Sequence, residues 1–360
     1  MTHNNYKRIF ILNSIGIGDL IFAIPFMKAL RKGMPDSEIT LAVSSAQLPI
    51  AQQLEGMVTD KLHLHQHKNR VLNMLYWLQE VPHLNPDLFI EFSGEYRYAI
   101  TGYFSHASRI IHPPHEYAKK VAQLFYSERF PKPASRHRVD IYLSYLSALG
   151  IPHNEVSFEF PIPQQIEERA IKVIDDYKLR GRKLVGVVPD SSQIWKDWTL
   201  RSLRQTIDTI VNDLDHEVVV FGKTPVHDLD GCRIMDLRGK TSLLLDAYLL
   251  RYSGLFDVVI GVDTGMMHIA GSVSSNDDGS YGKGVNGNRT ISLIGATDPS
   301  MYKPYDPTGR FNLVVHPNLD GVRMDPLGYV IDKHRGDYMG NLTPRMIVEK
   351  IERHLRDKVP

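Results

Sequence analysis

The sequence predicts an α/β protein built from two Rossmann-like domains, each containing a parallel β-sheet. Short apolar runs alternate with amphipathic helical segments along both halves of the chain, which is the pattern of βαβ units. The length of 360 residues exceeds what one hydrophobic core usually serves. A proline-bearing stretch, FEFPIPQQ (158–165), separates the halves, so we expect one domain over 1–160 and a second over 166–342.

The first half begins with the apolar strand RIFILN (8–13), and the glycine loop SIGIGD (14–19) follows it. The next segment, LIFAIPFMKALRKG, has helical spacing and ends at Gly33, which suits a helix C-cap. We expect three further strands and one amphipathic helix in this half: EITLAV (38–43), PDLFIEF (86–92), ASRIIH (107–112) and VDIYLSYLSALGIP (139–152).

The second half repeats the pattern of strand, loop and helix. Its four expected strands with their loops are KLVGVVPDSS (183–192), EVVVFGKTP (217–225), FDVVIGVDTG (256–265) and RTISLIGATDP (289–299). A final helix begins with Thr343 as N-cap and Pro344 at its first position. We treat 343–360 as a C-terminal helix that can cross back to the first domain. In such sheets ligands bind beyond the carboxyl ends of the strands, where these loops lie.

Composition excludes several classes of protein. The formal net charge is +1, so no overall field marks a nucleic-acid binder. Cys232 is the only cysteine, which excludes an internal disulfide and suits a reducing cytoplasm. No apolar run approaches the roughly 20 residues of a membrane span, although a peripheral membrane role stays open. Alternating histidines in HLHQH (63–67) have no acid or cysteine partner, so an edge strand fits them better than a zinc site, and we expect no metal.

The loop SIGIGD places an acid where nucleotide-binding loops place a phosphate. It lacks the third glycine of a dinucleotide fingerprint and the Lys-Ser/Thr ending of a Walker loop. A carboxylate at this helix start would repel a diphosphate, whereas the positive helix end favours its ionised form. Asp19 is therefore either a general base facing a cleft or a simple helix cap.

The stretch VDTGMMHIAGS (262–272) has the features of an anion site at a helix start. If Thr264 or Asp263 caps the helix, the amides that follow, beginning with that of Gly265, are donors at its positive end. His268 lies about one turn further and can reach the same ligand. The alternatives are ordinary capping for Asp263 and Thr264 and a packing role for His268.

The loop PDSSQIWKDW (189–198) supplies hydroxyls and a cation. Ser191, Ser192 and Lys196 are the groups that a pyrophosphate leaving group needs in the absence of Mg²⁺. We interpret Trp195 and Trp198, which flank the lysine, as packing anchors rather than stacking platforms.

Taken in order, these motifs resemble the ADP-heptose:lipopolysaccharide heptosyltransferases, the ninth glycosyltransferase family, which have the GT-B fold. The resemblance runs from GDLIFAIPFMKALRKGMPDSEITLAV through PDLFIEFSGEYRYA, PDSSQIWKDW, DLRGKTSLLLDAYLL and VDTGMMHIAGS to LIGATDPSMYKPY and NLTPRMIVEKI. It implies a metal-independent, inverting transfer of heptose from ADP-heptose to a lipopolysaccharide core or related glycan. It also implies work at the cytoplasmic face of the inner membrane, where a lipid-linked acceptor is anchored.

The resemblance assigns roles to residues already singled out. Asp19 matches the acid that deprotonates the acceptor hydroxyl. Donor contacts match seven positions: Ser191, Ser192, Lys196, Asp263, Thr264, Gly265 and His268. Position and charge add candidates for acceptor binding in the first domain: Gly18, Arg97, Arg109, Lys119 and Lys120.

Two departures from the family pattern bear on these expectations. Val226 and His227 stand where many members carry an acid that contacts the donor, and Asp228 is the nearest acid. The polar insertion 274–289 replaces a tight connection and is either surface or a lid. Two rival functions remain: a sugar-nucleotide epimerase on the same scaffold, which needs a second acid/base residue, and a non-catalytic nucleotide-sugar or glycan-binding relative.

Overall fold

A computed structural model describes residues 6–13, 15–64, 69–153, 155–223, 228–275, 288–334 and 336–356. The contacts divide the chain into two units, with the boundary between Pro161 and Ile162. The linker expected over 158–165 spans this boundary. None of the helices in the described ranges has the length and apolar character that a bilayer crossing requires.

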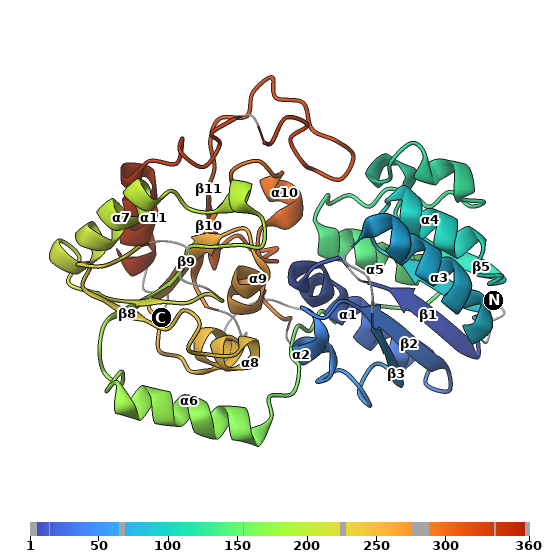
Figure 1. The fold of residues 1–360 in the computed structure, drawn as a ribbon, viewed down its shortest axis with the longest axis horizontal. Coiled ribbons are helices and arrows are strands. Elements are labelled where there is room, and N and C mark those ends of the chain that lie inside the picture. The colour runs from blue at the N-terminus through green and yellow to red at the C-terminus, as the bar shows by residue number, and fades with distance from the viewer. Residues whose placement is uncertain are drawn as a thin grey trace. The chain divides into compact units, whose positions relative to one another are not determined.

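In the first unit the described strands form one parallel sheet in the order β3-β2-β1-β4-β5 (Figure 1). Its elements are β1 (Arg8–Leu12), α1 (Ile17–Gly33), β2 (Glu38–Val43), α2 (Leu48–Ala51), β3 (Lys61–Leu64), α3 (Arg70–Leu84), β4 (Leu88–Glu91), α4 (Tyr96–Tyr103), β5 (Arg109–Ile111), η1 (His115–Tyr117), η2 (Ala122–Phe125) and α5 (Arg138–Ala148). The order reverses between β1 and β4, so the carboxyl ends of these two strands define the switch point where such sheets bind ligands.

Helices pack on this first sheet through large apolar side chains. Trp77 of α3 lies edge-on to Phe10 of β1, and Phe10 stacks on Phe89 of β4. Most of α1 is buried on all sides, from Leu20 to Met27, and α5 packs against it. The expectation that Gly33 caps α1 is wrong, because Gly33 is the last helical residue and Met34 is the C-cap. A Cβ on Gly33 would lie 2.7 Å from Ile151, so close packing requires this glycine.

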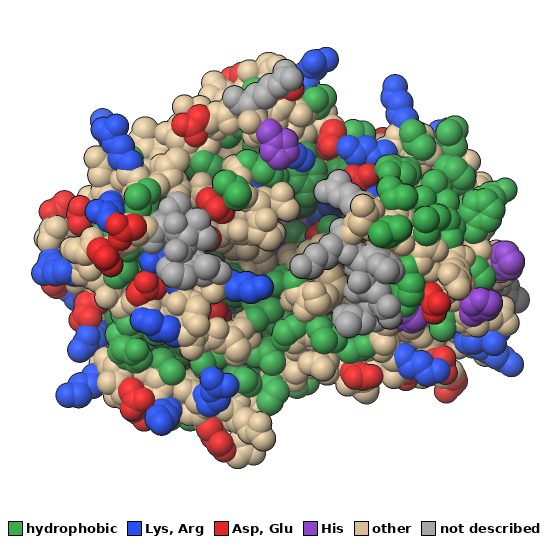
Figure 2. All heavy atoms as spheres, in the orientation of Figure 1, with side chains coloured by type: hydrophobic (Ala, Val, Ile, Leu, Met, Phe, Trp, Pro, Cys, Tyr) green, Lys and Arg blue, Asp and Glu red, His purple; other side chains and the backbone are tan. Residues whose placement is uncertain are grey.

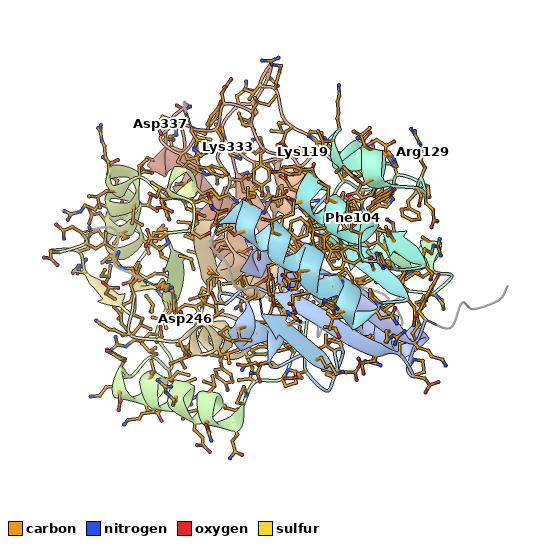
Figure 3. The ribbon with its side chains drawn as sticks, turned by 45° about the vertical axis from the view of Figure 1, so that its right-hand side comes forward. Phe104, Lys119, Arg129, Asp246, Lys333 and Asp337 are labelled. Atoms are coloured by element: carbon orange, nitrogen blue, oxygen red, sulfur yellow. The ribbon has the colours of Figure 1, made fainter. Side chains whose placement is uncertain are left out.

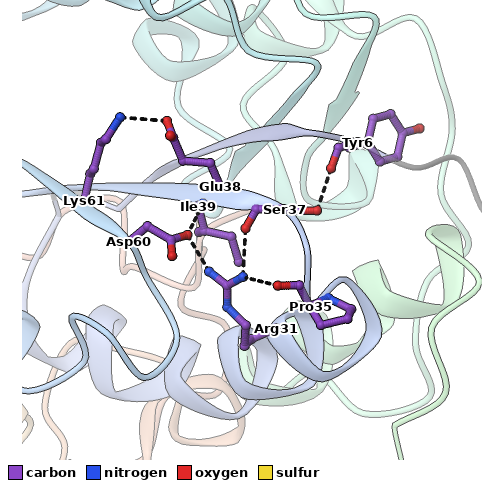
Figure 4. Close-up of polar contacts among 8 residues, drawn as sticks. All are labelled: Tyr6, Arg31, Pro35, Ser37, Glu38, Ile39, Asp60 and Lys61. Atoms are coloured by element: carbon purple, nitrogen blue, oxygen red, sulfur yellow. Dashed lines mark hydrogen bonds and ion pairs between the residues drawn. The ribbon is translucent and has the colours of Figure 1, made fainter.

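Arg31, near the end of α1, fixes this helix to the sheet (Figure 4). Its guanidinium donates to the carbonyls of Pro35 and Ser37 at 3.0 and 2.7 Å and to the Asp60 carboxylate at 2.5 Å. Asp60 also accepts the amide of Ile39 at 2.6 Å. These bonds hold together the end of α1 and the starts of β2 and β3.

In the second unit the described strands form another parallel sheet, in the order β11-β10-β9-β6-β7-β8. The elements are α6 (Gln164–Asp176), β6 (Leu184–Val188), η3 (Ile194–Lys196), α7 (Leu200–Asn212), β7 (Glu217–Val220), β8 (Ile234–Asp236), α8 (Leu243–Ala247), η4 (Tyr248–Tyr252), β9 (Val258–Val262), α9 (Gly265–Gly271), β10 (Thr290–Leu293), α10 (Pro299–Tyr302), β11 (Asn312–Val315) and α11 (Pro344–Arg356). Here the order reverses between β6 and β9.

Both faces of the second sheet are covered, which explains why its central strands β6 and β9 are apolar throughout. One face packs on α7 and α11, and the other packs on α6, α8 and α9. Thr343 accepts the amide of Met346 at 3.4 Å, so the expected N-cap of the last helix is confirmed. Helix α11 packs on α7 and on the second sheet, and the expected crossing back to the first unit stays a prediction.

Candidate functional site

The switch point of the second sheet carries a buried ion pair. Asp263 follows β9 directly, and Lys196 ends the short helix η3 after β6. The Lys196 Nζ lies 2.6 Å from Asp263 Oδ2, and their side chains are 14% and 4% exposed. Because β6 and β9 are hydrogen-bonded neighbours, the two loops meet at one edge of the sheet.

Asp263 has two further partners that sequence reasoning did not assign to it. The Thr297 hydroxyl donates to Oδ2 at 2.9 Å, and His268 Nε2 lies 3.5 Å from Oδ1. Burial alone would raise the pKa of Asp263, but the Lys196 ammonium and the His268 ring hold that pKa well below its usual range. The carboxylate is therefore ionised inside the protein and orients a lysine, a histidine and a hydroxyl around it.

Helix α9 is seated closely on the sheet behind this ion pair. Gly261 of β9 makes the approach possible, because a Cβ there would lie 2.7 Å from both the Met267 sulfur and the Val188 carbonyl. Thr264 occupies the N-cap in extended conformation, with no capping bond from its side chain. The expected set of donor amides is smaller than the sequence suggested, because the amide of Met267 bonds to the Thr264 carbonyl.

The serines after β6 differ in their surroundings. The Ser191 amide donates to Asp197 at 2.7 Å, and its hydroxyl bonds within the same turn to the backbone of Gln193. Ser192 is exposed. Trp198 is fully buried in the core, which confirms it as a packing anchor, whereas Trp195 is only partly buried.

Trp195 and Lys333 border a cavity of about 380 Å³ in the second unit. Lys333 Nζ lies 4.3 Å from the Tyr329 ring centroid and 5.2 Å from that of Trp195, and Lys196 lies 5.2 Å from the same Trp195 ring. Lys333 and Asp337 project from the segment before α11 (Figure 3). Two cations thus share one aromatic side chain at the border of the cavity.

Asp19 lies at the switch point of the first sheet, in the first turn of α1. Gly16 is the N-cap of α1, so Asp19 is not the capping residue. The Tyr142 hydroxyl donates to Asp19 Oδ1 at 3.4 Å. Gln47 donates to the Gly16 carbonyl at 2.8 Å, which fixes the glycine loop. Gly18 is the second residue of the helix and places no side chain between Ile17 and Asp19.

A second acid, Glu91, lies across the same switch point at the end of β4, paired in register with Leu12. It is fully buried and accepts the amides of Ser93 and Gly94 at 2.7 and 3.0 Å, and the hydroxyl of Tyr126. Burial raises the pKa of Glu91 to about 7, against the lowering effect of these bonds. Sequence reasoning missed this residue, although an acid ending a buried strand was the signal for it.

The four basic candidates for acceptor binding have different environments. Arg109 forms two bonds of 2.9 Å with Glu128 and one with the Ala148 carbonyl, so its guanidinium is engaged within the unit. Arg97 lies over the Tyr98 ring. Lys119 is half-buried and Lys120 is exposed.

Several other sequence features are only partly described. His63 contacts the Tyr76 hydroxyl at 2.6 Å, while His65 and His67 lie outside the described residues. Within the described ranges, the acid, histidine and cysteine side chains form no cluster suited to a metal ion. Residues 224–227, with Val226 and His227, and 276–287 of the polar insertion also lie outside them.

Comparison with known proteins places these features in context. The model of glycosyltransferase family 9 (heptosyltransferase) matches residues 85–321. Lipopolysaccharide heptosyltransferase 3 of Escherichia coli is 23% identical over 305 residues, which cover 80% of this chain and 83% of the relative.

Solved structures agree on the fold. The family 9 glycosyltransferase from Veillonella parvula has a TM-score of 0.68 at 19% identity, covering 99% of each chain. The E. coli heptosyltransferase WaaC with ADP-2-deoxy-2-fluoro heptose has a TM-score of 0.61 at 15% identity, covering 96% of this chain and 99% of that one. The predicted fold class, two α/β domains with parallel sheets, is confirmed.

Proposed function

Since the chain belongs to glycosyltransferase family 9 (heptosyltransferase) and is therefore a glycosyltransferase, we propose that it transfers heptose from ADP-heptose to a lipid-linked glycan. The acceptor we propose is a lipopolysaccharide core, as the name of the E. coli relative suggests. The enzyme would then work where such an acceptor is anchored, at the cytoplasmic face of the inner membrane.

The buried pair of Lys196 and Asp263 is the observation that carries the donor assignment. Lys196 keeps ammonium hydrogens for a diphosphate while Asp263 fixes its direction. As the bond to the sugar breaks, negative charge grows on the leaving diphosphate, and a preoriented ammonium stabilises it best in a water-poor site. The proposed donor site also includes five residues that follow the same two strands, β6 and β9: Ser191, Ser192, Thr264, Gly265 and His268.

Asp19 is the proposed base. Its carboxylate accepts the proton of the acceptor hydroxyl, whose oxygen attacks the anomeric carbon as the diphosphate leaves from the opposite side. Tyr142, which donates to Asp19 Oδ1, positions the carboxylate. Gly18, Arg97, Lys119 and Lys120 remain candidates for acceptor contacts. The engagement of Arg109 with Glu128 favours a structural role for that arginine.

Calorimetric titration with ADP, UDP, GDP, CDP and TDP tests the donor. Selective binding of ADP is expected, and at 100 times its dissociation constant a ligand adds about 3 kcal/mol to stability, which a thermal shift detects. Lys196→Ala should abolish the binding, whereas Lys172→Ala, on an exposed face of α6, should not. Selective binding of another nucleotide would show that the donor is a sugar linked to that nucleotide and not ADP-heptose.

Asp19→Asn tests the base. Donor binding should persist while transfer to a core oligosaccharide falls by about 10²–10⁴-fold. Asp36→Asn, at an exposed turn of the same unit, is the matched control. Unchanged transfer by Asp19→Asn would show that Asp19 is not the base. Donor binding without transfer by the unmodified protein would favour a non-catalytic relative, and interconversion of the free sugar nucleotide would favour an epimerase.

A further inference from the structure

The first unit carries an apolar face that its core does not use. The face is formed by α3, by α4 with the residue after it, and by η2 with the residue before it. Its members are Val71, Leu72, Leu75, Tyr96, Tyr103, Phe104, Val121 and Leu124. These are eight of the fourteen large hydrophobic side chains that are exposed among the described residues, so the exposure is concentrated on one unit.

The elements that form the apolar face pack against one another. Helix α4 contacts both α3 and η2. Tyr103 lies edge-on to Phe104 and to Phe125, with centroids 5.1 and 5.8 Å apart. Figure 2 shows the apolar side chains of this unit gathered into one patch at the right of the view. Leu124 is 80% exposed and Tyr103 is 58% exposed, so the patch projects into solvent.

Helix α3 is apolar on both sides, which packing alone does not explain. Its inner side places Trp77 and Val81 in the core of the unit. Its outer side exposes Val71, Leu72 and Leu75, where an ordinary surface helix carries polar residues. Contiguous exposed apolar surface of this kind marks an interaction site in a stable protein.

The sequence bordering this face is basic. Between residues 119 and 136 one acid, Glu128, stands among five basic residues, and Arg109 pairs with it. The basic residues are Lys119, Lys120, Arg129, Lys132 and Arg136. Figure 3 shows Phe104, Lys119 and Arg129 on this unit. Apolar and aromatic side chains beside lysine and arginine are the combination that binds anionic bilayers.

We propose that this apolar face docks on an anionic phospholipid surface. The proposal rests on the proposed function, because a lipid-linked acceptor is presented at such a surface. The apolar side chains would enter the boundary between headgroups and acyl chains, and the basic border would face the phosphates. A second copy of the chain fits less well, because pairing two such faces would bring their basic borders together.

Flotation with lipid vesicles tests the proposal. The full chain should float with vesicles of equal phosphatidylglycerol and phosphatidylcholine, and less with phosphatidylcholine alone. Leu75→Ser/Leu124→Ser should lower the partition coefficient by about tenfold or more, since two apolar anchors are lost. Arg129→Glu/Lys132→Glu should weaken binding to the anionic vesicles, and 0.5 M NaCl should weaken binding of the unmodified protein.

A matched control distinguishes binding through this face from nonspecific binding of exposed apolar side chains. Ile171→Ser/Tyr177→Ser removes two exposed apolar side chains of the second unit, one in α6 and one at its C-cap, and should leave flotation unchanged. The proposal is overturned if the unmodified protein stays with neither vesicle, or if the control pair loses binding as much as the test pair. It is also overturned if sedimentation shows a dimer that Leu75→Ser/Leu124→Ser dissolves, with no binding to vesicles.

Failure of docking and failure of the proposed function give different results. Calorimetry with ADP and transfer to a deacylated, water-soluble core oligosaccharide do not depend on a membrane. The pair Leu75→Ser/Leu124→Ser should retain both. If the unmodified protein retains both but binds no vesicle, docking alone fails. If it binds vesicles through this face but neither binds ADP nor transfers heptose, the proposed function fails.

Discussion

Tyr126 donates its hydroxyl to Glu91 in the interior of the first unit, and the Tyr126 ring stacks on His112 with centroids 3.6 Å apart. Tyr126 donates to Glu91 Oε1, whereas the amides of Ser93 and Gly94 donate to Oε2. Arg138 acts on it as the nearby positive charge. Glu91 is therefore a buried structural acid whose protonation is tied to folding.

The stability of the protein should fall as the pH rises through 7. The folded-state pKa of Glu91, about 7, exceeds its ordinary 4.5, so the folded protein holds this proton more tightly than the unfolded chain does. The resulting stability is fully present below about pH 4.5 and is lost as the pH rises through the folded value. From pH 5.5 to 8.5 the loss is ~2 kcal/mol.

Denaturant unfolding at the two pH values measures this loss. Glu91→Gln should remove the share that belongs to the first unit, while Glu116→Gln, an exposed acid of the same unit, should leave that share intact. Burial raises the pKa of Asp246 to about 7 as well, so Asp246→Asn should remove a separate share that belongs to the second unit. A slope that Glu91→Gln leaves unaltered would contradict the assignment.

Arg31 should contribute far more to stability than Lys61, although each makes an ion pair in the first unit. Arg31 also bonds two carbonyls and is 21% exposed, whereas Lys61 bonds Glu38 alone and is 62% exposed. We expect Arg31→Met to lower the free energy of unfolding by about 2 kcal/mol and Lys61→Met by less than about 0.5 kcal/mol. Equal effects in urea titrations would show that the two carbonyl bonds of Arg31, drawn in Figure 4, add nothing to stability.

Thr297→Val should weaken donor binding without disrupting the fold. The substitution keeps the volume but removes the hydroxyl that directs Asp263. Loss of about 1 kcal/mol corresponds to a fivefold rise in the dissociation constant for ADP, measured by calorimetry. Thr209→Val is the control, because that hydroxyl bonds a helix carbonyl on an exposed surface. An unchanged ADP affinity in Thr297→Val would mean that Asp263 needs no help from this hydroxyl.

Gly261→Ala should destabilise the second unit by about 1–3 kcal/mol, since the new methyl group overlaps Met267 and Val188. Gly186 on the neighbouring strand is the control, because its nearest atoms would lie at 3.4 Å, an ordinary contact. Gly186→Ala should therefore cost less than about 1 kcal/mol. Thermal unfolding of both variants makes the comparison, and equal losses would argue against close seating of α9.

The central strands of both sheets could be predicted because both of their faces are buried. Runs such as Val258–Val262 are apolar throughout and end in residues that stop a strand. The edge strands β8 and β11 were not predicted, because they are short and partly exposed, so their sequences carry a weak signal. The Gly33 prediction failed for a different reason. Glycine is favoured both at helix C-caps and where two elements pack closely, so the residue type alone does not tell the two apart.

The site was predicted in part for a reason of topology. Lys196 and Asp263 could be expected near each other because both follow strands of one parallel sheet. Thr297 lies in the loop after the neighbouring strand β10, but a lone threonine in that loop gave no reason to single it out. Glu91 was missed because its partner Tyr126 comes from a segment with no regular pattern of its own.

Lys196 and Asp263 form an ion pair with no net charge, which affects how the protein distinguishes among the many phosphates of a cell. A solitary lysine at a strand end would attract inorganic phosphate and nucleoside triphosphates according to their charge alone. Because Asp263 already balances this lysine, a ligand gains less from charge than it would at a solitary lysine, so directed bonds to the ligand matter more. If this is the donor site proposed above, inorganic phosphate should bind it more weakly than it would bind a solitary lysine.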